Sequence, residues 1–248
     1  MEGVKNPFAV RDGNIILIED LSENERGLNC HCKCPVCDGE FIARMGDAKI
    51  HHFAHSKDAC SDVLSYTSGL YKLIRQILNN GSPFYIPALV ISYSFPYNGV
   101  LTEDNISSYI NFVREDYDIA NKIVISPGRY IKFDNAELCV DNKNQIQALE
   151  LKYMKSKMAL KVMPPDTVCK ISTVSPHKNM ATLAIDFTYD ANIIQTSDSK
   201  QFQEYLLSVR LDKRWIYNPK IKKAYPQIIS LSRAAHETYL ERVKKIKK

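Results

Sequence analysis

Residues 30–60 read CHCKCPVCDGEFIARMGDAKIHHFAHSKDAC, and this stretch concentrates side chains that bind metals. It holds five of the seven cysteines and four of the six histidines of the chain. A single buried cysteine is most often a small hydrophobic residue, but so dense a group of thiols and imidazoles is typical of a metal site. We therefore expect this stretch to fold around a metal ion.

The spacing within the stretch predicts which side chains bind the ion. Cys34 and Cys37 are separated by two residues, and the same spacing recurs in His52 and His55. A tight Cys-x2-Cys turn lets two thiolates grip one ion, and two imidazoles complete a tetrahedron. Zinc suits this mixed sulfur and nitrogen set, and four protein ligands close its coordination shell. We predict a structural zinc site.

Three neighbouring residues remain alternative ligands. Cys60 follows His55 by five residues and could replace either histidine. His51 could replace His52, and Cys32 is a further spare thiol. The spacing does not choose among these sets.

Composition sets the broad class of the protein. The 248 residues are 45% hydrophobic and 25% charged, with a net charge of +5, which permits a nucleic-acid partner without requiring one. No run approaches the roughly 18 apolar residues of a membrane span, and the N-terminal residues lack the apolar segment of a secretory signal. Clustered cysteines, odd in number, do not resemble a secreted disulfide framework. We expect a cytoplasmic protein with reduced thiols and no membrane partner.

Hydrophobic periodicity divides the rest of the chain into strands and helices. An α+β fold is expected, with a strand and zinc-binding module in residues 1–62 and a larger domain in residues 63–248. Helical spacing predicts four helices, over residues 63–78, 106–113, 200–211 and 226–246. Alternation and turn residues predict eight strands, over residues 13–19, 86–95, 122–126, 129–133, 136–141, 147–154, 158–164 and 181–188. The short links in the middle of the chain favour an antiparallel meander.

The motifs around the cysteines resemble those of the competence-protein CoiA-like family. The matching segments are Cys34-Pro35-Val36-Cys37, Ile42-Ala43-Arg44-Met45-Gly46 and His51-His52-Phe53-Ala54-His55, with weaker similarity in residues 130–138, 184–187 and 215–219. In that family the cysteine-rich module precedes a restriction-endonuclease-like nuclease domain. The resemblance therefore implies a mixed sheet with flanking helices after the zinc module.

Nucleases of this fold hold Mg²⁺ with a carboxylate on one strand and a Glu-x-Lys or Glu-x-Gln pair on the next. When the family pattern is laid residue by residue on residues 146–151 and 159–162, Leu149 takes the aspartate position and Lys161 the glutamate position. Both carboxylates are then missing, and a lysine would repel Mg²⁺. This register predicts a degenerate catalytic site.

A second register keeps a candidate active site. Asp141 followed by Glu150 and Lys152 matches the family's spacing of an aspartate and a Glu-x-Lys pair. Strand alternation tests it, because Glu150 and Lys152 face water if Leu149 and Leu151 face the core. Whether the protein is an enzyme is left open by the sequence, and Mg²⁺ is expected only if it is active.

The resemblance implies that the protein engages nucleic acid, most naturally DNA, in prokaryotic DNA processing or antiviral defence. The rival hypotheses are an active Mg²⁺-dependent DNA endonuclease and a non-catalytic subunit that assembles with a protein partner or with further copies of itself. Aromatic and basic residues alternate in residues 129–132 and 213–217, where packing in the core competes with base stacking as the explanation. The basic run in residues 241–248 is typical of a solvated helix end.

Overall fold

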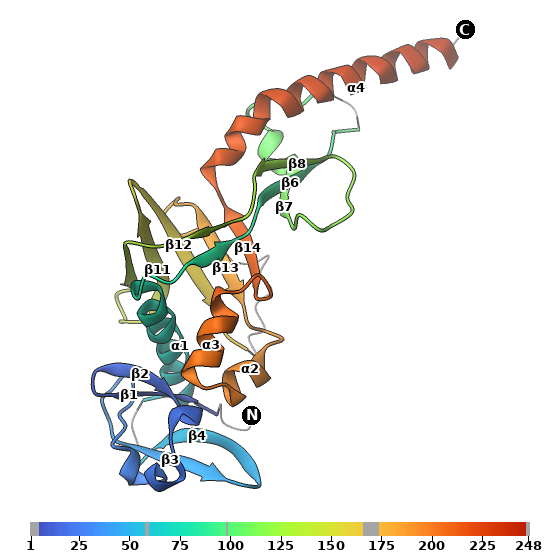
Figure 1. The fold of residues 1–248 in the computed structure, drawn as a ribbon. Coiled ribbons are helices and arrows are strands. Elements are labelled where there is room, and N and C mark those ends of the chain that lie inside the picture. Colours follow the sequence, from blue (N-terminus) through green and yellow to red (C-terminus); the bar gives the residue numbers. More distant parts are fainter. Residues whose placement is uncertain (1–4, 58–59, 98, 166–173, 247–248) are drawn as a thin grey trace.

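The computed structural model describes residues 5–57, 60–97, 99–165 and 174–246, and Figure 1 shows their arrangement. The expected α+β class is confirmed, since a cysteine- and histidine-rich module is followed by a multi-stranded sheet and helices. Within the described residues, no helix combines the length and apolar character that crossing a membrane requires.

The N-terminal module consists of two hairpins. Strand β1 (Phe8–Arg11) pairs with β2 (Asn14–Leu17), and β3 (Phe41–Gly46) pairs with β4 (Lys49–His55). The residues between the hairpins form short 3-10 turns at Ile18–Asp20, Glu23–Glu25 and Leu28–Cys30. A small core fills the module, and it contains Ala9, Ile18, Leu21, Cys30, Cys32, Cys34, Phe41, Ala43, Met45 and Phe53.

The central sheet has five strands in chain order. They are β10 (Asn135–Val140), β11 (Ile146–Tyr153), β12 (Ser156–Met163), β13 (Thr182–Asp186) and β14 (Asp212–Tyr217). All neighbours are antiparallel except β12 and β13, which run parallel, so the sheet is mixed, as expected. One face of it packs on helix α1 (Asp62–Asn79) through a large apolar core that also takes in helix α3 (Ser199–Leu207).

Smaller elements complete the body. Strand β5 (Phe84–Ile86) pairs with β9 (Arg129–Ile131), and β6 (Leu89–Tyr93) lies between β7 (Ile110–Val113) and β8 (Lys122–Ser126). The meander predicted for the middle of the chain is therefore wrong for residues 122–133, which pair with earlier strands, and right for β10 to β12. Helix α2 (Ala191–Thr196) precedes α3, and the long helix α4 (Tyr225–Ile246) extends beyond the rest of the body (Figure 1).

The helix predicted for residues 106–113 is wrong. A 3-10 turn at Ile106–Tyr109 leads into strand β7 instead. The apolar residues Ile106, Ile110 and Phe112 pack into a third cluster with Ile91 and Ile228. Pairing with β6 gives this segment its backbone hydrogen bonds, so the tertiary contact outweighs a weak helical pattern.

The N-terminal module and the larger body share core residues. Phe8, Ile15 and Leu17 of the first hairpin belong to the same apolar core as α1 and the central sheet. Phe8 packs so closely on α1 that a Cβ added to Gly69 would lie 2.4 Å from the Phe8 Cβ atom. The division at residue 62 remains a prediction, and the hairpin on its N-terminal side is built into the body's core.

Candidate metal centre

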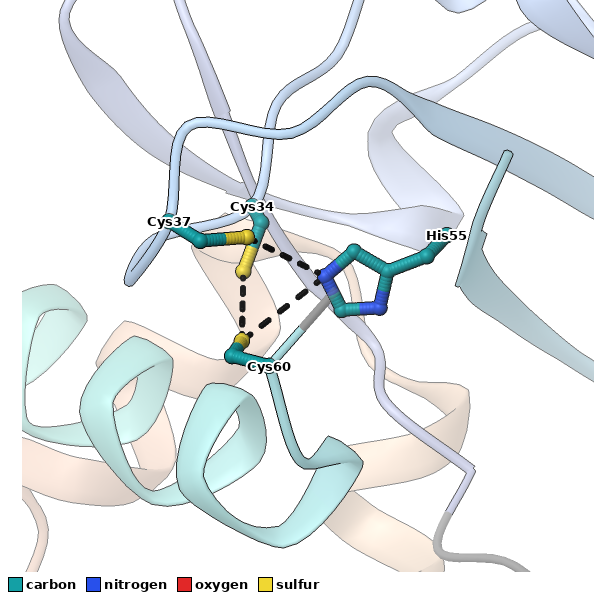
Figure 2. Close-up of side chains that lie close together, drawn as sticks. All are labelled: Cys34, Cys37, His55 and Cys60. Carbon is teal, nitrogen blue, oxygen red and sulfur yellow. Dashed lines mark hydrogen bonds between the residues drawn. The ribbon is translucent and has the colours of Figure 1, made fainter. Parts of the chain in front are cut away.

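Four side chains from three separate segments converge at one point of the N-terminal module. Cys34 and Cys37 come from the turn before β3, His55 from the last residue of β4, and Cys60 from the residues just before α1 (Figure 2). The turn is local and tight: the backbone N–H of Asp38 donates to the carbonyl of Cys34 at 3.2 Å, and Asp38 itself has a φ of 56°. The amide of Val36 also lies 3.4 Å from the Cys34 sulfur.

The distances among these four residues fit a tetrahedral ion. Their candidate ligand atoms all lie within 4.8 Å of one another. The sulfurs of Cys34 and Cys60 are 3.5 Å apart, and the Nε2 atom of His55 lies 3.5 Å from the Cys37 sulfur and 3.8 Å from that of Cys60. Zinc–sulfur bonds of about 2.3 Å in a tetrahedron place two sulfurs about 3.8 Å apart. Little movement is therefore needed for three thiolates and one imidazole to hold a metal such as zinc.

Surrounding groups orient the histidine and one of the thiols. The Nδ1 atom of His55 lies 3.7 Å from the carboxylate of Asp62, and its ring meets the edge of Phe41 with the centroids 4.8 Å apart. The hydroxyl of Ser65 lies 3.4 Å from the Cys34 sulfur. A carboxylate behind a ligating imidazole fixes the tautomer and strengthens the ligand. Asp62 and Ser65 both belong to the first turn of α1, so this helix positions the site.

Burial and local hydrogen bonds shift the pKa values of two of these thiols in opposite directions. Burial opposes ionisation of Cys37, but hydrogen bonds from the backbone of Cys60 and Gly39, and then from the side chains of Cys34 and His55, lower its pKa to about 6. Burial, and next the neighbouring thiol of Cys34, raise the pKa of Cys60 to about 12. A bound divalent cation would lower the pKa of both thiols, because it favours the deprotonated form of every thiol that binds it.

His52 lies outside this cluster, although its spacing from His55 matches that of the two cysteines. The reason is that residues 49–55 form a strand, in which side chains three positions apart point to opposite faces. His55 faces the cysteines, whereas His52 lines a groove on the other face and its Nδ1 lies 3.0 Å from the carbonyl of Ile50. Its place in the cluster is taken by the alternative ligand Cys60.

The other two alternatives have different surroundings. The Nδ1 atom of His51 lies 2.9 Å from a carboxylate oxygen of Glu19. Cys32 is buried in the small core of the module, and its thiol donates to the carbonyl of Cys30 at 3.2 Å. Burial, and then the thiol of Cys30, raise the pKa of Cys32 to about 12. Cys32 behaves as a buried apolar side chain.

The catalytic candidates do not converge. Asp141 begins the turn between β10 and β11, where it accepts hydrogen bonds from the amides of Lys143 (2.8 Å) and Gln145 (2.9 Å) and from the side chain of Gln147 (3.0 Å). Since Val140 pairs with Ile146, Asp141 lies at least about 13 Å along the strand from Glu150. Asp141 has the role of a turn-stabilising residue.

Glu150 and Lys152 lie on the face of β11 that points away from α1. Leu149 and Leu151 are fully buried in the core, so the alternation that separates the two faces is present. Glu150 pairs with Lys157 of β12 at 2.5 Å, and this contact lowers the pKa of the glutamate. Lys152 is exposed. Among the described residues, the only group of three or more His, Cys, Asp or Glu side chains close enough to hold a metal is the cysteine–histidine cluster.

Lys161 lies on the same face of the sheet as Glu150. It is half-buried, and burial lowers the pKa of its ammonium group. Its cross-strand neighbour on β13 is the small residue Ala184. Leu149, the other residue of the first register, points to the opposite face, so the two positions do not form one site.

The basic and aromatic residues of 213–217 lie in β14 and are packed rather than free. Lys213 is only 5% exposed; its ammonium group donates to the carbonyl of Ser208 at 2.5 Å and lies 4.9 Å from the centre of the Phe84 ring. The indole N–H of Trp215 donates to the carbonyl of Pro87 at 3.2 Å. These contacts favour the core explanation of this segment.

Comparison with protein families identifies the part of the chain that contains the metal cluster. Residues 19–62 match the family model described as competence protein CoiA, N-terminal domain. Comparisons with curated proteins and with solved structures give no significant match. The resemblance inferred from the cysteine and histidine motifs is thus confirmed for residues 19–62, the part of the chain that contains the metal cluster.

Proposed function

We propose that this protein is a zinc-containing, CoiA-like nuclease-fold protein of the cytoplasm that binds DNA without cleaving it, in prokaryotic DNA processing or defence. The carrying observation is a contrast: the cysteines and histidine of the N-terminal module converge on one point, whereas Asp141 of the central sheet lies in a turn away from Glu150.

The donor set of the metal cluster supports a structural zinc ion. Three thiols and one imidazole supply the four ligands that zinc takes in closed sites, which leaves no position for a substrate. The ligands also join the turn at Cys34, the end of β4 and the start of α1. Bound zinc would therefore brace the module against the helix.

The central sheet supports a role without catalysis. Asp141 is engaged in its own turn, and Glu150 is paired with Lys157. Lys161 adds a positive charge to the face on which Mg²⁺ would have to bind. A metal-dependent nuclease needs carboxylates that share one ion, and a lysine on the same face opposes the binding of a cation.

Two assays on the zinc-loaded full chain test the proposal. Fluorescence anisotropy with labelled single- and double-stranded DNA should detect binding that does not require Mg²⁺, and gel assays with Mg²⁺ or Mn²⁺ should detect no cleavage. Cleavage that a Glu150→Ala variant loses would instead establish an active endonuclease with Asp141, Glu150 and Lys152 at its centre. Absence of DNA binding would favour an assembly subunit.

A further inference from the structure

The outer face of the β3–β4 hairpin forms the floor of a groove of about 620 Å³. Arg44 and His52 are cross-strand partners on this floor. Two further segments form the walls, because Gly27 bridges to Ala43 beside β3 and Asn6 bridges to Phe53 beside β4. The groove is thus open to solvent on the face of the hairpin opposite the metal cluster.

Positive charge gathers around this groove. Each wall supplies one cation, Arg26 on one side and Lys5 on the other, and the hairpin supplies Arg44 and Lys49. Asp47 is the single carboxylate among the lining residues. The groove therefore carries a net charge of about +3 where the whole chain carries +5.

The side chains of these four cations are exposed, and in the described part of the chain none of them forms a salt bridge or a side-chain hydrogen bond. A cation that has no carboxylate partner retains its full attraction for a phosphate, since no ion pair must be broken first. The backbone of a nucleic acid is a row of such phosphates.

A second cleft shows the opposite arrangement. It has a volume of about 300 Å³ and lies between β7 and β14, with Arg114 and Arg214 in its lining. Arg114 pairs with Asp116 at 2.7 Å, and Arg214 pairs with Asp212. Arg114 and Arg214 are thus neutralised within the fold, and the three carboxylates Glu115, Asp116 and Asp212 also line this cleft, so it is the weaker candidate for a phosphate site.

We infer that the groove on the β3–β4 hairpin binds the phosphate backbone of DNA through Arg26, Arg44 and Lys49, with Lys5 at its edge. This inference rests on the proposed DNA binding and names its surface. The metal cluster and the groove use opposite faces of one strand, because His55 turns to the cysteines and His52 to the groove. Zinc at the first face would hold the hairpin in the shape that presents the second.

The test compares two variants of the full zinc-loaded chain that each lose three positive charges. The groove variant is Arg26→Gln/Arg44→Gln/Lys49→Gln, and the matched control is Arg242→Gln/Lys244→Gln/Lys245→Gln on α4. We expect the groove variant to lose at least about tenfold in affinity for labelled double-stranded DNA at moderate salt. The logarithm of the association constant decreases with the logarithm of the salt concentration, and the steepness of this decrease should drop by about 2.7, since each lost phosphate contact removes about 0.9. The control should change little in either quantity.

The outcomes separate this inference from the proposed function. If the unaltered protein binds no DNA, the proposed function fails and the inference with it. If the unaltered protein binds and the groove variant weakens no more than the control, the inference alone is wrong. Inorganic polyphosphate that displaces DNA at equal phosphate concentration would overturn DNA as the ligand. Zinc content of both variants verifies folding, and single Arg44→Gln and Lys49→Gln variants serve if the triple variant does not fold.

Discussion

The N-terminal module and the central sheet each contain a strand whose sequence resembles a set of metal ligands, and the side chains of the two strands have different neighbours. In β4, one of the three histidines, His55, meets three cysteines that come from a turn and from the residues just before a helix. In β11, Glu150 and Lys152 share a face, and Glu137 of β10 lies directly across from Glu150, but the described residues form no group of three or more metal ligands there. A strand supplies one ligand well, because its next side chain on the same face is two residues away and the remaining ligands must come from other segments. In the module such segments supply three cysteines, whereas in the sheet the neighbouring strand β10 places only Glu137 across from Glu150.

The largest effect should follow from breaking the metal cluster. Cys60→Ser and His55→Ala should abolish tight zinc binding and unfold the module, because zinc binding and folding are coupled in such sites. Zinc content by mass spectrometry or a colorimetric chelator, together with thermal unfolding, measures both effects. Cys32→Ser and His52→Ala are the matched controls and should retain about one zinc per chain. Loss of zinc in His52→Ala with retention in Cys60→Ser would reverse the assignment of the fourth ligand.

The next largest effect concerns the two faces of β11. Leu149→Ala should lower the free energy of unfolding by about 2–5 kcal/mol, because it leaves a cavity in the core against α1. Glu150→Gln, one residue further on, should leave stability nearly unchanged, since it removes only a pair with the exposed Lys157. Denaturation with urea measures both. Equal losses in the two variants would mean that Glu150 lies in a structured site after all.

The join between module and body can be tested at Gly69. Gly→Ala in a helix normally stabilises by up to about 1 kcal/mol, but here the new methyl group would collide with Phe8. We expect Gly69→Ala to destabilise the protein by about 1–3 kcal/mol, the usual cost of overpacking a core. Arg75→Ala, at an exposed position of the same helix, should stay within about 0.5 kcal/mol of the unaltered protein. A stabilised Gly69→Ala would show that the first hairpin is not held against α1.

The sequence predicts local features well in both regions. The helices expected over residues 63–78 and 226–246 agree within two residues with α1 and α4, since apolar periodicity and an Asn-Asn-Gly stop or an N-terminal proline mark them. The Cys34-x2-Cys37 turn is equally local. For this reason the first two members of the metal cluster follow from spacing alone.

Partners that are distant along the chain are less predictable. The choice of Cys60 over His52 depends on residues 49–55 being a strand, because the alternation of a strand places His52 and His55 on opposite faces. The pairing of β6 with β7 and β8 has no comparable local signal. The walls of the groove also have no local sequence signal, because only isolated bridges bring Lys5 and Arg26 beside the hairpin.

The smallest expected effect tests whether a cation of the sheet serves packing and not ligand binding. Burial lowers the pKa of Lys213 to about 7, well below its value in the unfolded chain. Between these two pKa values the unfolded state binds more protons than the folded state, so stability rises with pH. Raising the pH from 7 to 8 should therefore increase the free energy of unfolding by about 1 kcal/mol through this residue. In Lys213→Met the same increment should be missing, and subtracting the two pH profiles removes the contributions of cysteines and of other groups common to both proteins. A pH profile that Lys213→Met leaves unaltered would mean that the ammonium group reaches solvent and stays charged, as a side chain available to a ligand would.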